Sequence, residues 1–405
     1  MGGYLITKKK SDCIACGACA QVCPYSAITM HLDEYGFLYP IIENDQCVSC
    51  NKCINVCPYE HEIVKNKLPI CSYGGYIRDK EIRRKSTSGG AFTALCRAFC
   101  EGHNDYVIFG CTSEGLNIFH TYVESLDRID IFNSSKYGQS VIGDSFRQAK
   151  KFLNEKKRVV FSGTPCQIAG LNNFLVSVDK SNLLTIEVLC TGVPSSLFMK
   201  KYDEWCKKKY GYNIKEFNYR YTNVNKWDDQ PTLLVLENDK RVVTARWFSN
   251  FYSIFLQRLM SRPSCNECRF VTKERVADFS LSDLWGLDKE YPDLYDDGSG
   301  TSWIICNNIK ASEILHIAQK EMNGHGVDFE RMRKYQRPGL IKKTVHPQYN
   351  EFMEDLKTMD YRELCKKWAK KPSIKLLWQK YIWNNRARVR LWKIKNKLNL
   401  RKKVL

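Results

Sequence analysis

Short apolar runs alternate with amphipathic stretches over most of the chain beyond residue 76. The runs at 158–162 and 183–189 each lead through a short turn containing glycine into apolar residues at helical spacing, over 167–175 and 195–210. Further strands are expected at 106–111, 117–123, 277–285 and 303–306, and further helices at 91–99 and 144–155. The alternation predicts an α/β core with a mixed or parallel sheet and flanking helices.

Two regions outside this core have patterns of their own. Near the N-terminus, residues 27–30 and 37–40 flank Tyr35-Gly36 and predict a small β-hairpin. After the last expected strand, residues 309–370 are predicted to be mostly helical. The expected parts are a small α+β module at 1–66, the first part of the core at 67–160, its second part at 161–325, and a basic helical tail at 326–405.

Eight of the nineteen cysteines fall between residues 13 and 57, in two copies of the pattern Cys-x2-Cys-x2-Cys-x3-Cys-Pro. This spacing is typical of a bacterial-type ferredoxin with two [4Fe-4S] clusters, in which the fourth cysteine of each run binds the other cluster. Zinc sites use two cysteine pairs around one tetrahedron, and a disulfide framework is typical of exported domains, so both alternatives fit less well. The expected ligand sets are Cys13, Cys16, Cys19 and Cys57 for one cluster, and Cys47, Cys50, Cys53 and Cys23 for the other.

A second group of cysteines predicts a third cluster. Cys265-x2-Cys268 is a ligand pair by its spacing and needs two more ligands. Cys166 and Cys190 are the best candidates, because each follows an expected buried strand and parallel strands bring their carboxyl ends together. Cys166 as a nucleophile at a helix N-terminus, or as a buried free thiol, remains an alternative.

The segment Ser86-Thr87-Ser88-Gly89-Gly90 lies between an expected strand and an expected helix. Free N–H groups at a helix N-terminus can bind an anion, and glycines let a phosphate approach the backbone. Alone this is a weak signal, because a Ser-Gly-Gly helix start is more often just a cap. The remaining cysteines and the seven histidines show no ligand spacing and are assigned no role.

The formal net charge of +19 is concentrated at one end of the chain. Residues 371–405 contain twelve Lys or Arg and no Asp or Glu. Contact of residues 373–405 with an anionic membrane surface, binding of an acidic redox partner, and a solvated helix packed on its own domain are all open, and nucleic acid is the least favoured partner. The chain has no long apolar run and no export signal, so we expect a cytoplasmic protein, with or without peripheral contact at the inner face of the membrane.

Taken together, these motifs resemble the coenzyme F420 hydrogenase/dehydrogenase beta-subunit family joined to an N-terminal two-cluster ferredoxin domain. The resemblance covers roughly residues 10–320. Its blocks are the ferredoxin pair, Lys85–Gly90, Lys136–Ser140, Gly163–Leu171, Cys190–Ser195, Cys265–Phe270, Ala277-Asp278 and Asp283–Gly286. Thr191 and Ser282 depart from the pattern, because many relatives carry His and Gly there.

The resemblance implies an FAD-dependent iron–sulfur oxidoreductase. It makes Ser88, Gly89 and Gly90 contacts of the flavin phosphates, places Thr87 and Lys136 near the flavin, and makes Gly163, Thr164 and Gln167 part of the site lining. It also makes Cys166, Cys190, Cys265 and Cys268 the ligands of the third cluster. Lys136 or Lys273 is our expectation for a cation that stabilises the reduced flavin.

The function predicted from the sequence is electron transfer from a ferredoxin-type donor through [4Fe-4S] clusters to FAD, and on to a small-molecule or glycan-precursor substrate. The resemblance extends to proteins encoded near surface polysaccharide genes. The alternatives are a non-catalytic electron-transfer subunit of a larger complex and reduction of a deazaflavin coenzyme. The substrate cannot be read from the residues.

Overall fold

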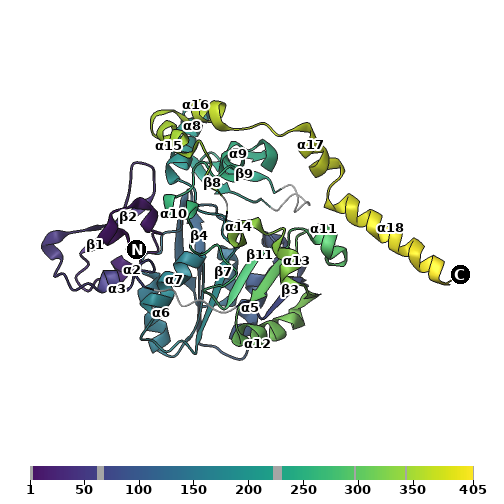
Figure 1. Ribbon diagram of the computed structural model, residues 1–405, viewed down its shortest axis with the longest axis horizontal. Coiled ribbons are helices and arrows are strands. Elements are labelled where there is room, and N and C mark those ends of the chain that lie inside the picture. Colours follow the sequence, from purple (N-terminus) through teal and green to yellow (C-terminus); the bar gives the residue numbers. More distant parts are fainter. Residues whose placement is uncertain (1–2, 62–67, 222–229, 296–297, 343, 405) are drawn as a thin grey trace.

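A mixed sheet of eight strands forms the centre of the protein (Figure 1). The computed structural model describes residues 3–61, 68–221, 230–295, 298–342 and 344–404. In spatial order the strands are β13 (Met322–Gly326), β3 (Cys71–Ile77), β12 (Ser302–Cys306), β11 (Phe279–Asp283), β7 (Leu183–Val188), β6 (Arg158–Gly163), β4 (Tyr106–Glu114) and β5 (Asn117–Val123). β11, β7, β6 and β4 are parallel to one another, and the other pairings are antiparallel. The predicted α/β class with a mixed sheet is therefore confirmed.

Helices cover both faces of this sheet, because successive strand residues point to opposite sides. Ile108 and Val160 pack with α5 (Ala91–Cys100) and α12 (Ile309–Ala318) on one face. Their neighbours Val107 and Val159 pack with α6 (Ser145–Asn154) and α7 (Pro165–Phe174) on the other. The central strands are buried on both faces, which explains their continuous apolar runs in the sequence.

A smaller antiparallel sheet of three strands packs with a group of helices above the main sheet (Figure 1). Its strands are β8 (Ile214–Asn218), β9 (Thr232–Leu236) and β10 (Arg241–Thr244). Its helices are α8 (Ser196–Tyr210), α9 (Asn250–Leu256), α15 (Tyr349–Thr358) and α16 (Tyr361–Trp368). The short helices elsewhere are α1 (Tyr4–Thr7), α4 (Lys80–Lys85), α10 (Pro263–Asn266), α11 (Leu287–Glu290), α13 (Phe329–Arg333) and α14 (Arg337–Leu340).

The N-terminal module contains α2 (Ala18–Val22), α3 (Lys52–Asn55) and the expected hairpin of β1 (Ile28–Leu32) and β2 (Leu38–Ile42). The hairpin turn docks on the start of α8, where Ser196 Oγ donates to the carbonyl of Gly36 at 2.7 Å. A Cβ on Gly36 would lie 2.5 Å from the backbone nitrogen of Leu197, so only glycine permits this approach. On the other side, Gln21 Oε1 accepts from the backbone N–H of Phe146 at 2.9 Å, in the first turn of α6. The module is thus packed onto the core at two places.

The C-terminal region departs from the sequence prediction in two details. The stretch expected to be mostly helical also contains β13, whose residues pair with β3 at the sheet edge. The tail is not one helix: α17 (Ile374–Leu377) continues into a π-helical turn (Trp378–Ile382), and α18 (Asn385–Val404) follows a break. α18 extends away from the body of the protein (Figure 1). In the part of the chain that the structure describes, no helix is both long and apolar enough to span a membrane.

Candidate functional site

The first predicted ligand set of the N-terminal module lies together, facing the core. Burial raises the pKa of the Cys16 thiol well above its usual value, and the charges of Cys19, Cys57 and Cys13 raise it further. The same neighbours, Cys13 and Cys57, raise the pKa of Cys19 after burial. Cys57 belongs to the second sequence motif, so the structure brings it to the three cysteines of the first motif, as the spacing predicts.

The second ligand set lies nearer the surface. Cys47 and Cys50 are exposed, and their charges raise the pKa of Cys53 after burial. Cys23 is half-buried, and its sulfur accepts from the backbone N–H of Ala27 at 3.3 Å. The second ligand set therefore lies on the accessible side of the module, and the first ligand set lies on the side that faces the core.

Four further cysteines gather at the carboxyl ends of the parallel strands. Cys166 lies in the first turn of α7 after β6, Cys190 follows β7, and Cys265 and Cys268 lie in and just after α10. Burial raises the pKa of Cys190 well above its usual value, and Cys265, Cys166 and Cys268 raise it further. The topology thus places together the four cysteines that the sequence suggested as a third set.

Gly192 permits the close approach of two of the turns that carry these cysteines. Its φ of +109° is a conformation that side chains rarely adopt, and a Cβ there would lie 3.2 Å from the Cβ of Cys265. Gly192 lies two residues after Cys190, whose sulfur accepts from the Gly192 N–H at 3.3 Å. A side chain at this position would push the Cys190 turn away from Cys265.

A nucleophilic role for Cys166 finds little support in its surroundings. Burial raises the pKa of this thiol to about 12, although a hydrogen bond with Thr164 opposes the shift. The thiol is then protonated at neutral pH, so it is a poor nucleophile without a metal to stabilise the thiolate. Among the described residues, no three His, Cys, Asp or Glu side chains converge as ligands of a single metal ion. A cubane does not need such convergence, because each thiolate binds a different iron.

The buried N-terminal set and the third set are neighbours across α7. A Cβ on Gly170 would lie 2.8 Å from both Cβ and Sγ of Cys16, so α7 contacts the cluster loop directly. Tyr59 lies on the same boundary: the charges of Cys268 and Cys166 help to raise its pKa, after burial and against the opposing charge of Arg269. The Arg269 guanidinium lies 4.0 Å from the centre of the Tyr59 ring.

The turn from Thr164 to Gln167 has a structural task of its own. Thr164 and Gln167 form a capping box at the start of α7, in which Gln167 Oε1 accepts from the Thr164 N–H at 2.9 Å. Gln167 Nε2 donates to the carbonyl of Ser140 at 3.2 Å, which links this turn to the segment that follows Lys136. A Cβ on Gly163 would lie 3.2 Å from Gln167 Oε1, so glycine leaves room for this bond. These three predicted lining residues therefore lie together beside Cys166.

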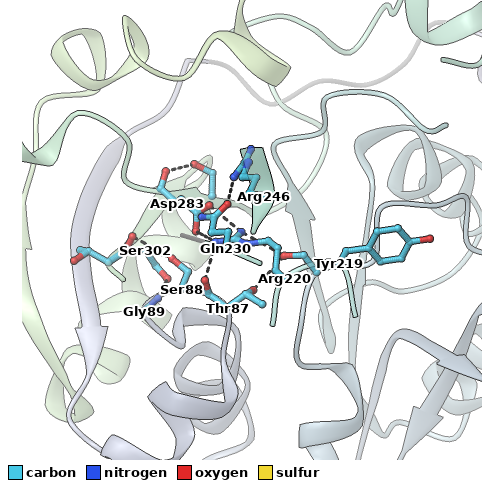
Figure 2. A network of polar contacts seen from close by, with 12 residues as sticks. Thr87, Ser88, Gly89, Tyr219, Arg220, Gln230, Arg246, Asp283 and Ser302 are labelled. Carbon is cyan, nitrogen blue, oxygen red and sulfur yellow. Dashed lines mark hydrogen bonds and ion pairs between the residues drawn. The ribbon is translucent and has the colours of Figure 1, made fainter. Parts of the chain in front are cut away.

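The Ser86–Gly90 turn also uses its groups within the protein. Ser88 Oγ donates to the carbonyl of Thr301 at 3.1 Å, and the Gly89 N–H donates to Ser302 Oγ at 2.9 Å (Figure 2). Gly89 packs against the sheet, because a Cβ would lie 2.4 Å from the carbonyl oxygen of Gly75. Gly90, at φ +76°, starts α5, whose first turn has no side-chain cap. The N-terminal end of α5 is thus the part of this turn that suits a phosphate, while Gly89 allows close packing against the sheet.

Arg220 connects the Ser86–Gly90 turn to the end of β11, and no sequence motif pointed to it. Its guanidinium forms a buried ion pair with Asp283 at 2.9 Å and donates to the carbonyl of Thr87 at 2.8 Å (Figure 2). It also donates to Ser135 Oγ at 3.4 Å, and Ser135 contacts Thr87 Oγ1 at 3.2 Å. Asp283 and Thr87 lie in motifs that the sequence displays, but Arg220 is a lone basic residue after β8.

Several buried donors around Arg220 have no hydrogen-bond partner within the described ranges. They are Arg220 Nε, Gln230 Nε2 and Arg246 Nε. Arg246 bonds Gln230 Oε1 (Figure 2) and lies 4.7 Å from the ring centre of Tyr252. Every one of these groups is an N–H donor, and burying such donors unpaired is costly. The site is therefore suited to a ligand rich in hydrogen-bond acceptors.

The two lysines proposed for the flavin have different surroundings. Lys136 Nζ is bound by backbone carbonyls, the closest being that of Asn133 at 2.7 Å. Burial lowers its pKa to about 8, and the charge of Cys111 opposes that shift. Lys273 is partly exposed and forms an ion pair with Glu330 at 2.5 Å. Among the described residues, no hydrogen bond or ion pair joins Lys273 to the turns that hold the other predicted site residues.

The fold and the site define an iron–sulfur redox protein built on an α/β core. Residues 156–325 match the family model for the C-terminal part of the coenzyme F420 hydrogenase/dehydrogenase beta chain, and residues 12–61 match the 4Fe-4S dicluster domain. The chain therefore contains a region of this beta-subunit family and an N-terminal dicluster domain, which is an iron–sulfur electron-transfer domain.

Among solved structures, the chain is similar to a chain in the F420-reducing [NiFe] hydrogenase complex from Methanosarcina barkeri. The two share 15% sequence identity with a TM-score of 0.46, over 76% of this chain and 97% of the other. No curated protein matches the sequence.

Proposed function

We propose that the protein is a flavin-dependent iron–sulfur reductase that receives electrons at its N-terminal clusters and delivers them to a substrate bound near Arg220. The observations that carry this proposal are the gathering of four cysteines from three separate segments and a group of buried, unpaired donors around Arg220. The cysteines suit a third [4Fe-4S] cluster, and the donors suit a flavin nucleotide. A ferredoxin or a similar low-potential protein fits as the external donor, because the exposed Cys47–Cys53 set is the accessible end.

The third cluster would be held by Cys166, Cys190, Cys265 and Cys268. All four thiols have a pKa raised by burial, and for Cys265 it rises to about 11. Thiols in such surroundings stay protonated unless a metal centre compensates the negative charge. Cys16 of the first set lies against α7, the helix whose first turn contains Cys166, so this position suits transfer between two clusters.

The flavin would lie between the start of α5 and the Arg220 network. The uncapped first turn of α5 would hold its phosphates, and the unpaired N–H groups of Arg220, Gln230 and Arg246 would donate to its acceptor atoms. When bound, FAD supplies the means to collect single electrons and pass on a hydride. The chain's part is to bind and orient this group and to place positive charge near it.

The group of unpaired donors around Arg220 favours an enzyme over a passive electron relay. A protein that only relays electrons needs clusters in sequence, and it has no use for a buried group of unpaired donors. A deazaflavin and a glycan precursor for surface polysaccharide are the two substrate classes that the proposal admits.

Anaerobic purification of the full chain followed by iron, sulfide and flavin analysis tests the proposal. We expect about twelve irons and one FAD per chain. A preparation with about eight irons and no flavin, even after incubation with FAD, would contradict it. About twelve irons without flavin would instead support the relay within a larger complex.

We predict that Lys136 gives flavin reduction a pH dependence with a midpoint near the pKa of about 8 that its burial produces. The charged form, present below that pH, stabilises an anionic reduced flavin, and the neutral form above it does not. Lys136→Met should therefore slow flavin reduction roughly tenfold at pH 7 and remove the dependence, while Lys136→Arg should keep the rate high above pH 8. Stopped-flow reduction over a pH series is the measurement.

Lys273→Met is the matched control, because Lys273 has a partly exposed ion pair with Glu330. It should leave both the rate and the pH dependence unchanged. An unaltered pH profile in Lys136→Met would remove Lys136 from the proposed site, whatever the absolute rate.

A further inference from the structure

The C-terminal segment presents an apolar stripe that nothing in the described part of the chain covers. On α18, Leu391, Ile394 and Leu398 are three and four residues apart and all exposed. Residues at this spacing share one face of a helix. The side chain of Leu398 is 53% exposed to solvent.

The first turn of α18 attaches the helix to the body on the side opposite the stripe. Val389 is 2% exposed and packs in the cluster around Leu284 and Trp303. Beside it, Arg388 Nε donates to Asp288 of α11 at 2.6 Å. Two residues along a helix correspond to a rotation of about 200°, so the Leu391 stripe faces away from the side held by Val389. The first turn of α18 is thus fixed to the body, and the stripe lies on the opposite side of the helix.

Basic residues border the exposed stripe on both sides. Helical geometry places Arg390 and Lys397 along one edge of the stripe and Lys395 along the other. Long basic side chains can lay their stems beside apolar groups and hold their charges at the level of lipid headgroups. The region from 371 to 405 has no acidic residue to oppose this.

The turns before α18 repeat the arrangement. Ile374, Trp378 and Ile382 are four residues apart, and all are exposed, with Ile374 at 87%. Trp378 stacks with Trp383 at 6.2 Å between ring centres, and both rings are partly open to solvent. Tryptophan prefers the boundary between water and lipid, and exposed isoleucine and leucine beside basic residues suit the same boundary.

We infer that residues 374–398 form a docking surface for an anionic lipid bilayer, which holds the protein at the membrane face without crossing it. The apolar stripe enters the headgroup boundary, and the bordering lysines and arginines contact the acidic headgroups. This inference is independent of the flavin and of the third cluster, because it rests on α17 to α18 alone.

Vesicle flotation of the full chain under anaerobic conditions tests the inference. We expect binding to phosphatidylcholine vesicles that contain about 30 mol% phosphatidylglycerol, and none to phosphatidylcholine alone. Binding should fall about tenfold in a variant that loses the stripe, and by a similar factor in a variant that loses the charges. The stripe variant is Leu391→Ser, Ile394→Ser and Leu398→Ser, and the charge variant is Arg390→Gln, Lys395→Gln and Lys397→Gln.

Val176→Ser is the matched control, because Val176 is 79% exposed but lies beyond the end of α7 in the body of the protein. It should bind vesicles like the unchanged chain, and all variants should keep the same cluster absorbance, since each substitution is at the surface. Failure to bind the anionic vesicles would overturn the inference, and so would full binding by the stripe variant. Retention by an acidic protein or RNA without vesicle binding would overturn it as well and assign the surface to that partner.

Discussion

Substitution of Cys265 by serine should lower the iron content from about twelve to about eight atoms per chain. Cys265 is one of four thiols that gather from three segments, and its charge raises the pKa of both Cys166 and Cys190. Loss of one thiolate exposes the cluster to hydrolysis, while the eight cysteines of the dicluster domain are unaffected. Electron paramagnetic resonance of the reduced protein should retain the signals of the two N-terminal clusters and lose the third.

The same substitution should stop flavin reduction by a protein donor, because the N-terminal clusters then have no acceptor at the core. Cys96→Ala is the matched control: Cys96 is fully buried on α5 and belongs to none of the three cysteine groups. It should keep the full iron content. Unchanged iron in Cys265→Ser would show that the four cysteines do not hold a cluster.

Arg262→Gln should change the reduction potentials of two clusters at once. Arg262 is completely buried between the first N-terminal set and the third set. Its charge lowers the pKa of Cys13 on one side and of Cys166 and Cys265 on the other, in each case against the larger effect of burial. A reduced cubane carries one more negative charge than an oxidised one, so removal of this cation should move both potentials to more negative values.

Arg262 also attaches the dicluster domain to the core. It donates to the carbonyls of Cys13 and Leu38, each at 2.8 Å, and to Gln139 Oε1 at 3.0 Å, and its guanidinium lies 4.4 Å from the ring centre of Tyr39. Hydrogen bonds from a charged donor contribute about 1.5–3 kcal/mol each, so the substitution should cost on the order of 3 kcal/mol of stability. Limited proteolysis should then release the N-terminal module more quickly.

Arg258→Gln separates the effect on potential from a general loss of structure. Arg258 donates to the carbonyl of Cys265 at 2.6 Å, and its charge lowers the pKa of Cys265 and Cys268, whereas the charge of Arg262 also lowers that of Cys13. Redox titration should therefore show one shifted potential in Arg258→Gln and two in Arg262→Gln. Equal behaviour of the two variants would contradict the position of Arg262 between two clusters.

The features that could be predicted from the sequence are those with a repeated motif or a regular spacing of apolar residues. The two cysteine runs identify the dicluster domain by spacing alone, and the apolar runs at 158–162 and 183–189 correspond to β6 and β7. β13 was missed because its residues, Met322–Gly326, are glycine-rich and largely exposed. Gly324 becomes part of the sheet only through β3, where a Cβ would lie 2.2 Å from the carbonyl oxygen of Gly74.

The residues that complete the candidate site had no local signal. Arg220, Arg262 and Gln230 are single polar residues outside any motif, and their positions depend on contacts with segments that are distant in the sequence. The glycines of the Ser86–Gly90 turn show the reverse case: the motif was visible, but Gly89 is needed for packing against the backbone of β3 and β12. Spacing indicates which chemistry is present, whereas burial and pairing decide which atoms remain available for a ligand.

The contact between Gly170 and Cys16 limits how freely this dicluster domain could be exchanged for another. Ferredoxin domains are often treated as interchangeable units, yet here a helix of the core meets the cluster loop at a point with no room for a methyl group. A domain taken from a different protein would need the same loop shape at this point, or it would tilt away and lengthen the electron path. The two parts of the chain are therefore constrained to change together, and a chimera should lose electron transfer before it loses either cofactor.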